Sequence, residues 1–487
     1  MRLEAPALRF HPRPAVHLLV ALLVLAAGLA LALLPLKIAA ALVAGAFFAL
    51  VVLAEPAWGL YGAVLSVPVQ ELVPLPAGLT VTQAVVALTA GAWLLRVLAH
   101  PDRPLGLRYQ WPWLLFLSWQ LLAVAATPYS LPAALQQWAR WVAAWLTFVL
   151  TLGTITDRRR AWGLVAALLL APLLAALLGI SQFLTASGPP SYLILGGRFA
   201  RAAATFVKPN PFAGYLNMAW PLALALGAYF GAAALRGAGG RARLWALILG
   251  GCAGILLLGL FASYSRGGWL GAMAGLLVLA LLAGRRTAAA AGLAVVLFLL
   301  VGLLGAFSIL PPVVVERMGA ITNNLRLFDA GKEPVNDENF AVVERMAHWQ
   351  AAWRMWRAHP ALGIGPGNFD LAYPDFFVGR WSISQGHAHN YYLHILAEAG
   401  PGGLALYLAL IAAIFLQALR LRRIGRGTVW EAVALGGCGI IFAVAGHNVF
   451  ENLHVLNLGI QLSGVWGLLL VAERWVHDEP GVDRRRV

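Results

Sequence analysis

Long apolar runs separated by short polar segments are the dominant pattern of this chain. The runs have roughly 17–24 residues, which is enough to cross ~30 Å of hydrocarbon at 1.5 Å per residue. Backbone polar groups inside a membrane must be bonded within their own segment, so runs of this length form helices. We therefore predict an all-α polytopic membrane protein with about 12–14 transmembrane helices. The candidate spans begin near Val16, Ile38, Trp58, Thr80, Trp111, Leu131, Ala161, Pro211, Leu244, Gly268, Thr287, Gly402, Thr428 and Leu453.

The first run, Val16 to Leu34, is longer than the core of a signal peptide, and no convincing cleavage site follows it. We therefore predict that it is a retained membrane helix. Along the chain we predict four parts. They are N-terminal transmembrane helices (1–183), transmembrane helices with arginine-bearing outer loops (184–309), a large extracytoplasmic loop domain (310–401), and C-terminal helices with a cytoplasmic tail (402–487).

Composition agrees with this layout and indicates its orientation. Charged residues make up 11% of the chain, whereas soluble domains average about 25%. The net charge of +15 does not indicate nucleic-acid binding, because the arginines lie in short clusters between apolar runs. Such clusters mark the cytoplasmic side of a membrane, and their alternation predicts cytoplasmic N- and C-termini. Cys252 and Cys438 lie inside apolar runs, which predicts buried small hydrophobes rather than a disulfide or a metal pair.

The large outer loop contains a helical pattern within residues 341–359. Apolar residues recur there at helical steps, at Val342, Met346, Trp349, Trp353 and Trp356. We predict an amphipathic helix that either lies on the outer membrane surface or caps the helix bundle. The pattern alone favours equally an ordinary helix packed within the loop domain.

Arg198, Arg201 and Arg266 fall on the predicted outer face, where the positive-inside bias disfavours them. Arg266 lies in a tight, glycine-flanked connection between two spans. Guanidinium groups bind phosphate in a bidentate manner and remain charged. These arginines therefore predict a docking site for an anionic headgroup such as a diphosphate, with Lys208 and Asn210 as neighbouring candidates. Interfacial snorkelling is the alternative.

A second polar segment, residues 386–403, leads from the large loop into the next span. Within it His389 is the candidate base. A neutral imidazole near pH 7 accepts a proton from a sugar hydroxyl, or orients the hydroxyl, as its oxygen attacks an anomeric carbon. Asn390 is a candidate for fixing a hydroxyl or a backbone group, and His387 and His394 compete with His389 for its role.

A zinc site is the competing interpretation of this segment, with His387, His389 and His394 joined by Asp375 or Glu398. The spacing matches no His-Glu-x-x-His pattern, and no cysteine lies nearby. We therefore predict no metal.

A third polar patch runs from Gly446 to His454, at the outer end of a span. His447, Asn448 and Glu451 are unusually polar for that position. They either line the same cavity or belong to a solvated loop, and the pattern slightly favours the solvated loop.

At these residues the chain resembles the O-antigen ligase and polymerase superfamily of bacterial inner-membrane glycosyltransferases. His389-Asn390, nine residues and then Gly400-Pro-Gly-Gly403 is similar to the ligase signature of His-Asn, nine residues and Gly-x-x-Gly. Arg266 in Ser-Arg-Gly-Gly and Arg201 in the preceding outer loop are similar to the family's two loop arginines. The run from Arg345 to Phe369 also looks like this family.

The resemblance implies a GT-C-like bundle in the bacterial cytoplasmic membrane with its active site on the outer face. It implies a cofactor-free, metal-independent, inverting transfer of a glycan from undecaprenyl diphosphate to a glycan, lipid or protein hydroxyl. Arg201 and Arg266 would hold the diphosphate and His389 would activate the hydroxyl. The substrate-binding candidates beside them are Arg198, Lys208, Asn210, Asn390, His387 and Arg345.

Two alternatives remain open from the sequence. A polymerase of the same superfamily would use a second lipid-linked repeat as its acceptor. An anion transporter, of the kind that carries bicarbonate, would place ionisable residues near the middle of its spans. The predicted spans are nearly free of charge at their centres, which favours the enzyme.

Overall fold

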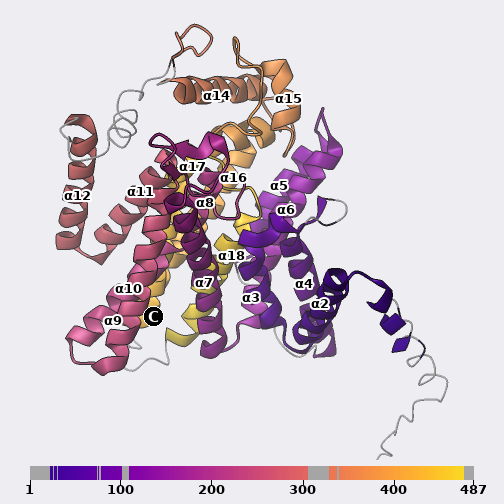
Figure 1. The fold of residues 1–487 in the computed structure, drawn as a ribbon, viewed down its shortest axis with the longest axis vertical. Helices are drawn as coiled ribbons and strands as arrows, with labels where there is room; N and C mark the ends of the chain where they lie inside the picture. Colours follow the sequence, from indigo (N-terminus) through magenta and orange to yellow (C-terminus); the bar gives the residue numbers. More distant parts are fainter. Residues whose placement is uncertain are drawn as a thin grey trace, which may run out of the picture. The chain divides into compact units, whose positions relative to one another are not determined.

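The computed structural model describes residues 22–100 except 23, 26, 30, 74, 76 and 77, and residues 109–304, 328–336 and 339–476. The described elements are almost all α-helices (Figure 1). Residues 1–55 and 56–487 form two compact units, which we describe separately. The first unit holds α2 (Leu36–Ala54).

The second unit holds the remaining helices and the candidate site. Its helices are α3 (Pro56–Ser66), α4 (Val81–Ala99), α5 (Trp111–Ala125), α6 (Leu131–Thr154), α7 (Arg158–Leu184), α8 (Pro209–Asn217), α9 (Trp220–Leu235), α10 (Gly239–Ala262), α11 (Arg266–Ala283), α12 (Arg285–Leu304), α14 (Phe340–Ala358), α15 (Phe369–Phe376), α16 (Tyr391–Ile424), α17 (Val429–Asn448) and α18 (Leu458–Val476). The connections contain the 3-10 helices η1 (Val67–Leu72) and η3 (Pro190–Tyr192) and an antiparallel strand pair, β1 (Leu193–Ile194) and β2 (Phe199–Ala200).

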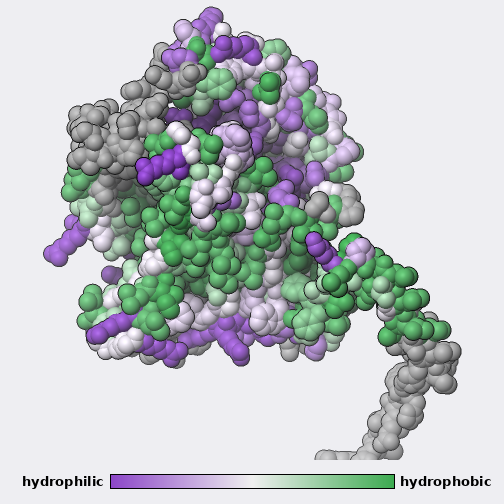
Figure 2. All heavy atoms as spheres, viewed as in Figure 1, coloured by the Kyte–Doolittle hydropathy of each residue, from purple (hydrophilic) through white to green (hydrophobic). Residues whose placement is uncertain are grey.

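Eight helical stretches in the described part of the chain are long and apolar enough to cross a membrane. They are α2, α4, α7, the continuous α8–α9 stretch, α10, α11, α16 and α17. Figure 2 shows apolar side chains across the middle of the bundle in the second unit and hydrophilic side chains at its two ends. The predicted all-α polytopic membrane protein is confirmed.

Several span boundaries differ from those predicted. The span expected from Trp58 is an 11-residue helix, α3, which passes into η1 where Pro68 removes a backbone donor. Within α16, Gly400 has a non-helical backbone and separates a first helical segment that begins at Tyr391 from the span expected from Gly402, whose start therefore agrees with the prediction. Helix α18 begins at Leu458 rather than Leu453. Most of the run from Val16, the N-terminal arginines and the C-terminal arginine cluster lie outside the described residues.

Glycines line the contact between α11 and α17 and bring the two backbones close together. A Cβ on Gly271 would collide with the Ala443 carbonyl oxygen, and a Cβ on Gly275 would lie 2.8 Å from the Gly439 carbonyl oxygen. Small residues permit such backbone approach between membrane helices. This packing places the first turn of α11, which begins at Arg266, beside the last turn of α17. The two cysteines are buried and unpaired, as predicted.

The predicted loop helix is present as α14, which packs on α15 and α16 at one end of the bundle (Figure 1). This arrangement corresponds to the capping alternative. The predicted apolar stripe is wrong in register, because the side chain of Trp353 is 47% exposed. Small alanines allow close packing on the opposite side, so the buried face contains Val343, Met346, Ala347, His348, Ala351, Ala352 and Met355.

Candidate functional site

Four connections between helices meet at one end of the bundle. They are residues 198–208 before α8, 263–265 between α10 and α11, 385–390 before α16, and 449–457 between α17 and α18. Hydrogen bonds and ion-pair contacts join these connections to one another, partly through the first turn of α8. Segments far apart in the sequence therefore form one polar cluster. We call residues 385–390 the histidine loop.

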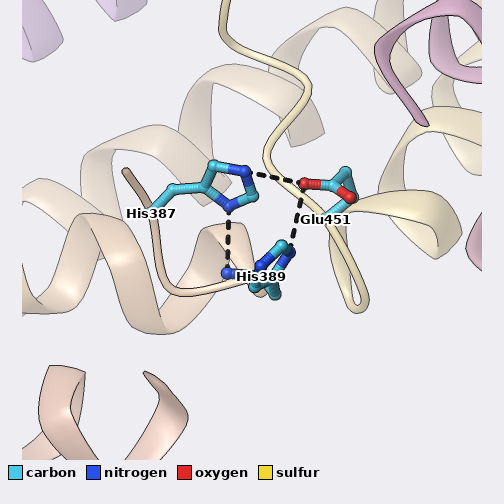
Figure 3. Close-up of side chains that lie close together, drawn as sticks. All are labelled: His387, His389 and Glu451. Carbon is cyan, nitrogen blue, oxygen red and sulfur yellow. Dashed lines mark hydrogen bonds and ion pairs between the residues drawn. The ribbon is translucent and has the colours of Figure 1, made fainter. Parts of the chain in front are cut away.

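Glu451, in the connection between α17 and α18, is the centre of this cluster. Its side chain is 3% exposed. Oε1 lies 3.0 Å from His387 Nε2 and 3.5 Å from His389 Nδ1 (Figure 3). Oε2 accepts a hydrogen bond from Nδ2 of Asn210, at the start of α8. One buried carboxylate therefore joins the histidine loop to the segment that carries Arg201.

Arg201 is held against the end of α10. Its Nε donates to the Ser263 carbonyl oxygen at 3.1 Å, and its Nη2 donates to Oδ1 of Asn210 at 3.5 Å. The next residue, Ala202, donates its backbone N–H to the Ala262 carbonyl oxygen at 2.9 Å. These bonds connect Arg201 both to Glu451, through Asn210, and to the connection that leads into α11.

Arg266 is the first residue of α11 and is half-buried. The side chain of Ser265 caps this helix by accepting the Gly268 N–H at 3.2 Å. Helix N-termini attract anions because their first N–H groups point outward and carry partial positive charge. Since Arg201 donates to Ser263, in the same connection, the two predicted phosphate-binding arginines come from adjoining segments.

A hydrogen bond inside the histidine loop fixes the tautomer of neutral His387. The backbone N–H of His389 donates to His387 Nδ1 at 3.1 Å, so this nitrogen carries a lone pair. The ring proton is therefore on Nε2 and is donated to Glu451. The Asn390 side chain accepts the Leu393 N–H at 3.0 Å, so it caps α16.

Burial and neighbouring charges set the ionisation of the cluster. Burial lowers the pKa of His387 well below its ordinary value; Glu451 opposes this shift, and Lys208 adds to it. Burial alone would raise the pKa of Glu451, but His387, His389 and Arg345 outweigh burial and hold that pKa well below its ordinary value. The cluster therefore contains an ionised carboxylate beside a neutral His387.

The structure brings most of the predicted site residues into or beside this cluster. Those that bond within it, adjoin it or act on it through charge are His387, His389, Asn390, Arg201, Asn210, Arg266, Arg345 and Lys208. Arg198 differs, because it is exposed and its guanidinium carbon lies 5.5 Å from the centre of the Phe199 ring. The structure does not bring Arg198 to Glu451.

Glu451 is the main residue of the cluster that the local sequence pattern did not identify as part of the site. The favoured interpretation of residues 446–454 as a solvated loop is wrong, because His447, Asn448, Glu451 and His454 are all buried. The local pattern of an acid among several histidines at a helix end was the available signal. Its burial depends on partners from distant segments, which no local pattern reveals.

Glycines shape the start of α16 after the histidine loop. Gly400 has a φ of +67°, and a Cβ there would collide with the Ala361 carbonyl oxygen. A Cβ on Gly402 would collide with the ring of Trp119, in α5. These two glycines therefore allow the kink and the close packing that direct the first turns of α16.

Gly400→Ala is expected to destabilise the protein by about 2–4 kcal/mol, because it combines left-handed strain with overpacking. Thermal unfolding in detergent, followed by tryptophan fluorescence, measures the change in Tm. Gly254→Ala in α10 is the matched control, because a Cβ there meets nothing within 4 Å. An unchanged Tm for Gly400→Ala would contradict the packing argument.

His387, His389 and Glu451 also form a group whose potential metal-ligand atoms lie within 4.8 Å of one another. This group differs from the zinc set of the competing interpretation, since His394 lies beside Glu398, with Nε2 and Oε2 3.4 Å apart. A metal on His387 Nε2 would require the ring proton to move to Nδ1, which faces the His389 backbone N–H. The hydrogen-bond pattern therefore suits proton transfer better than metal binding.

An apolar cavity of about 230 Å³ lies between α16, α17 and α18. Tyr392, in the turn that follows the histidine loop, is part of its wall, and its hydroxyl donates to the Ala445 carbonyl oxygen at 2.9 Å. Phe415, Phe442 and Trp466 supply aromatic surface further along. Such a lining suits a hydrocarbon chain rather than a sugar.

Stability is expected to fall as the pH drops from about 6.5 toward 4. Burial lowers the pKa of His348 to about 4 and that of His454 to about 3, and it also lowers the pKa of His387. In this range the unfolded chain binds protons that the folded protein does not. Each histidine therefore lowers the free energy of unfolding by at most about 1.4 kcal/mol per pH unit. The Tm should therefore be lower at pH 5 than at pH 7. His348→Gln should reduce the dependence of Tm on pH, whereas His100→Gln, at an exposed position, should not. A Tm independent of pH would contradict this expectation.

A comparison with models of known protein families finds a match within this chain. Residues 251–408 match the model of a family described as O-antigen ligase. The matched stretch includes Arg266, Arg345, His389 and Gly400, whereas Glu451 lies beyond it. A comparison with curated proteins gives no match. Residues 251–408 of this polytopic helical membrane protein therefore match an O-antigen ligase domain, which supports membership of the O-antigen ligase superfamily.

Proposed function

We propose that this protein is an O-antigen-ligase-like glycosyltransferase that moves a glycan from undecaprenyl diphosphate to an acceptor hydroxyl, without a metal and with inversion at the anomeric carbon. The observation that carries the proposal is the Glu451 link. One buried carboxylate contacts His389 directly and Arg201 through Asn210. A base for a hydroxyl and a cation for a diphosphate thus belong to one bonded cluster.

The reaction begins with the orientation of His389. Nδ1 of His389 lies 3.5 Å from ionised Glu451, and in the proposed reaction it carries the ring proton and closes on this carboxylate, which leaves a lone pair on Nε2. The acceptor oxygen attacks the anomeric carbon, and its proton passes to His389 Nε2. The bond from the anomeric carbon to the diphosphate oxygen breaks, and its electron pair leaves with the diphosphate.

Arg201 and Arg266 stabilise the charge that develops on the departing diphosphate, together with the first turn of α11. A diphosphate is already a good leaving group, so catalysis depends mainly on positioning and charge stabilisation. Lys208 and Arg345 add positive potential around the same cluster, as their effects on His387 and Glu451 indicate.

The surroundings of the cluster are consistent with a lipid substrate. The apolar cavity beside Tyr392 can take up a hydrocarbon chain of the donor or of a lipid acceptor. We place the site on the outer face of the bacterial cytoplasmic membrane, with both chain termini cytoplasmic and residues 310–401 as an extracytoplasmic loop domain. The acceptor is a glycan, lipid or protein hydroxyl, and no step requires a cofactor.

Two other functions make different predictions. A polymerase of the same superfamily would use the same cluster with a second lipid-linked repeat as acceptor. An anion transporter would require ionisable groups midway through the bundle. The described cluster lies instead in connections at helix ends, which favours chemistry at the membrane interface.

The proposal is tested with purified protein in nanodiscs, given an undecaprenyl-diphosphate glycan and host membrane extract as acceptor, in the presence of a chelator. Wild type should form product, and His389→Ala should not. His359→Ala, at the end of α14, is the matched control and should behave like wild type. Product that depends on an added metal ion would contradict the metal-independent route.

The products distinguish the alternatives. Glycan joined to an acceptor in the extract supports a ligase, whereas a ladder on the lipid carrier indicates a polymerase. Equal transfer by wild type and His389→Ala would remove the support for this site. Absence of transfer together with anion flux across sealed vesicles would support the transporter.

A further inference from the structure

A buried histidine beside the histidine loop has no part in the proposed reaction. His348, in α14, has no exposed surface, and both of its ring nitrogens are bonded. Nδ1 lies 2.7 Å from the Glu344 carbonyl oxygen, and Nε2 accepts the backbone N–H of Gln385 at 3.2 Å. We propose that His348 is a positioning residue, which holds the histidine loop so that His389 faces Glu451. The catalytic part of this inference rests on the proposed function.

The two hydrogen bonds define one protonation state of His348. Nε2 faces a donor and must carry a lone pair, so the proton is on Nδ1 and is donated to the Glu344 carbonyl oxygen. A doubly protonated ring would place an N–H against the Gln385 N–H. Burial lowers the pKa of this ring to about 4, so it is neutral at pH 7. With both nitrogens engaged, His348 is not a second base but an acceptor that holds a backbone group.

Helix α14 holds the histidine loop at both of its ends. Gln385 is bonded twice, since its backbone N–H donates to His348 and its side-chain Nε2 donates to Oε1 of Glu344 at 3.1 Å. At the other end, Trp349 Nε1 donates to the His389 carbonyl oxygen at 3.3 Å. The rings of His348 and His389 also meet edge to face, with their centroids 5.5 Å apart.

His389 needs this support because its backbone is left-handed, with a φ of +52°. A non-glycine residue pays about 1–2 kcal/mol for that conformation, so it persists only where the surroundings hold it. When the acceptor for the Gln385 N–H is lost, the loop relaxes and His389 Nδ1 moves away from Glu451. A misplacement of about 1 Å of a reacting group costs on the order of 10²-fold in rate.

The test compares three variants by the kcat and donor KM of glycan transfer and by hydrogen–deuterium exchange of residues 385–390. His348→Phe keeps a ring against Tyr373, where the native ring centroids are 4.7 Å apart, but removes the acceptor. We expect its kcat to fall about 10–100-fold with the donor KM within about twofold, and exchange of the loop amides to rise. His348→Gln supplies an acceptor and should restore most of the kcat.

Tyr373→Phe is the matched control, because it removes a hydrogen bond to the Trp381 carbonyl oxygen and keeps an aromatic ring against His348. It should leave kcat and exchange of residues 385–390 unchanged. Wild-type kcat and exchange in His348→Phe would overturn the proposal, as would a loss that Tyr373→Phe shares. If His348→Phe does not fold, Trp349→Phe asks the same question by removing only the donor to His389.

Hydrogen exchange separates the two proposals. It needs no substrate, so it measures loop positioning even if the wild-type protein transfers no glycan. Raised exchange in His348→Phe without transfer by wild type would contradict the proposed function and leave the positioning role supported. Unchanged exchange with normal transfer by wild type would contradict the positioning role alone.

Discussion

Glu451→Gln should reduce glycan transfer by about 10³-fold or more while the protein remains folded. The described side-chain partners of this carboxylate are His387 Nε2, His389 Nδ1 and Asn210 Nδ2, and Oε1 also accepts the Asn452 backbone N–H. In the state that the cluster requires, all three donate. In either orientation of its side-chain amide, a glutamine at this position therefore places its own N–H₂ group against another hydrogen-bond donor. It also lacks the negative charge that stabilises His389 once that ring has taken a proton.

Product formation in a single turnover measures this loss, and tryptophan fluorescence checks that the variant is folded. Glu473→Gln is the matched control, because this carboxylate pairs with Arg420 at 3.1 Å, near the opposite end of α18 from Glu451. The control should retain the wild-type rate. A Glu451→Gln protein within tenfold of the wild-type rate would show that the carboxylate does not orient the base.

Replacement of Arg266 by alanine should reduce transfer by about 10²–10³-fold, because it removes a charged donor from the departing diphosphate. Lysine should restore only part of the rate, since it cannot bind phosphate in a bidentate manner. Arg201→Ala should have a similar effect and should also loosen Asn210, to which Arg201 donates. Rates at saturating and limiting donor separate loss of binding from loss of catalysis.

Arg198→Ala is the informative comparison. The sequence places Arg198 and Arg201 in the same outer loop and predicts a substrate-binding role for Arg198, but Arg198 is exposed over the Phe199 ring. Its removal should change the rate by less than about threefold, as is usual for an exposed surface charge. If Arg198→Ala were as slow as Arg266→Ala, the proposal that Arg201 and Arg266 bind the diphosphate at the start of α11 would be contradicted.

The positions of the membrane helices could be predicted because lipid imposes one requirement on every apolar run. At α16 the break that Gly400 and Pro401 predict is present, because Gly400 has a non-helical backbone, but the helical segment from Tyr391 to Ala399 before it was not predicted. For α14 the helical period could be predicted from the sequence, but the buried face could not. That face is rich in alanine, whereas the prediction assigned it to the larger, more hydrophobic tryptophans.

Some residues of the candidate site could likewise be predicted from the sequence and others could not. His389 and Arg266 are identified by local motifs, whereas Glu451 becomes part of a site only through Asn210 and the histidine loop. Its local sequence is typical of a solvated turn. His348 likewise has an ordinary place in an amphipathic helix, and its pairing with Gln385 depends on a turn that follows α15.

Glu451 lies in the connection before α18, so the ribosome synthesises it after the other residues of the cluster. Translation proceeds at about 5–20 residues per second, so the glutamate is made about 10–40 s after Arg266. The arginine segments exist throughout that interval, and the histidine loop exists for about its last third, without the carboxylate that joins them. Under the proposed function, a chain that terminates before Glu451 is therefore expected to insert its earlier helices into the membrane and to transfer no glycan.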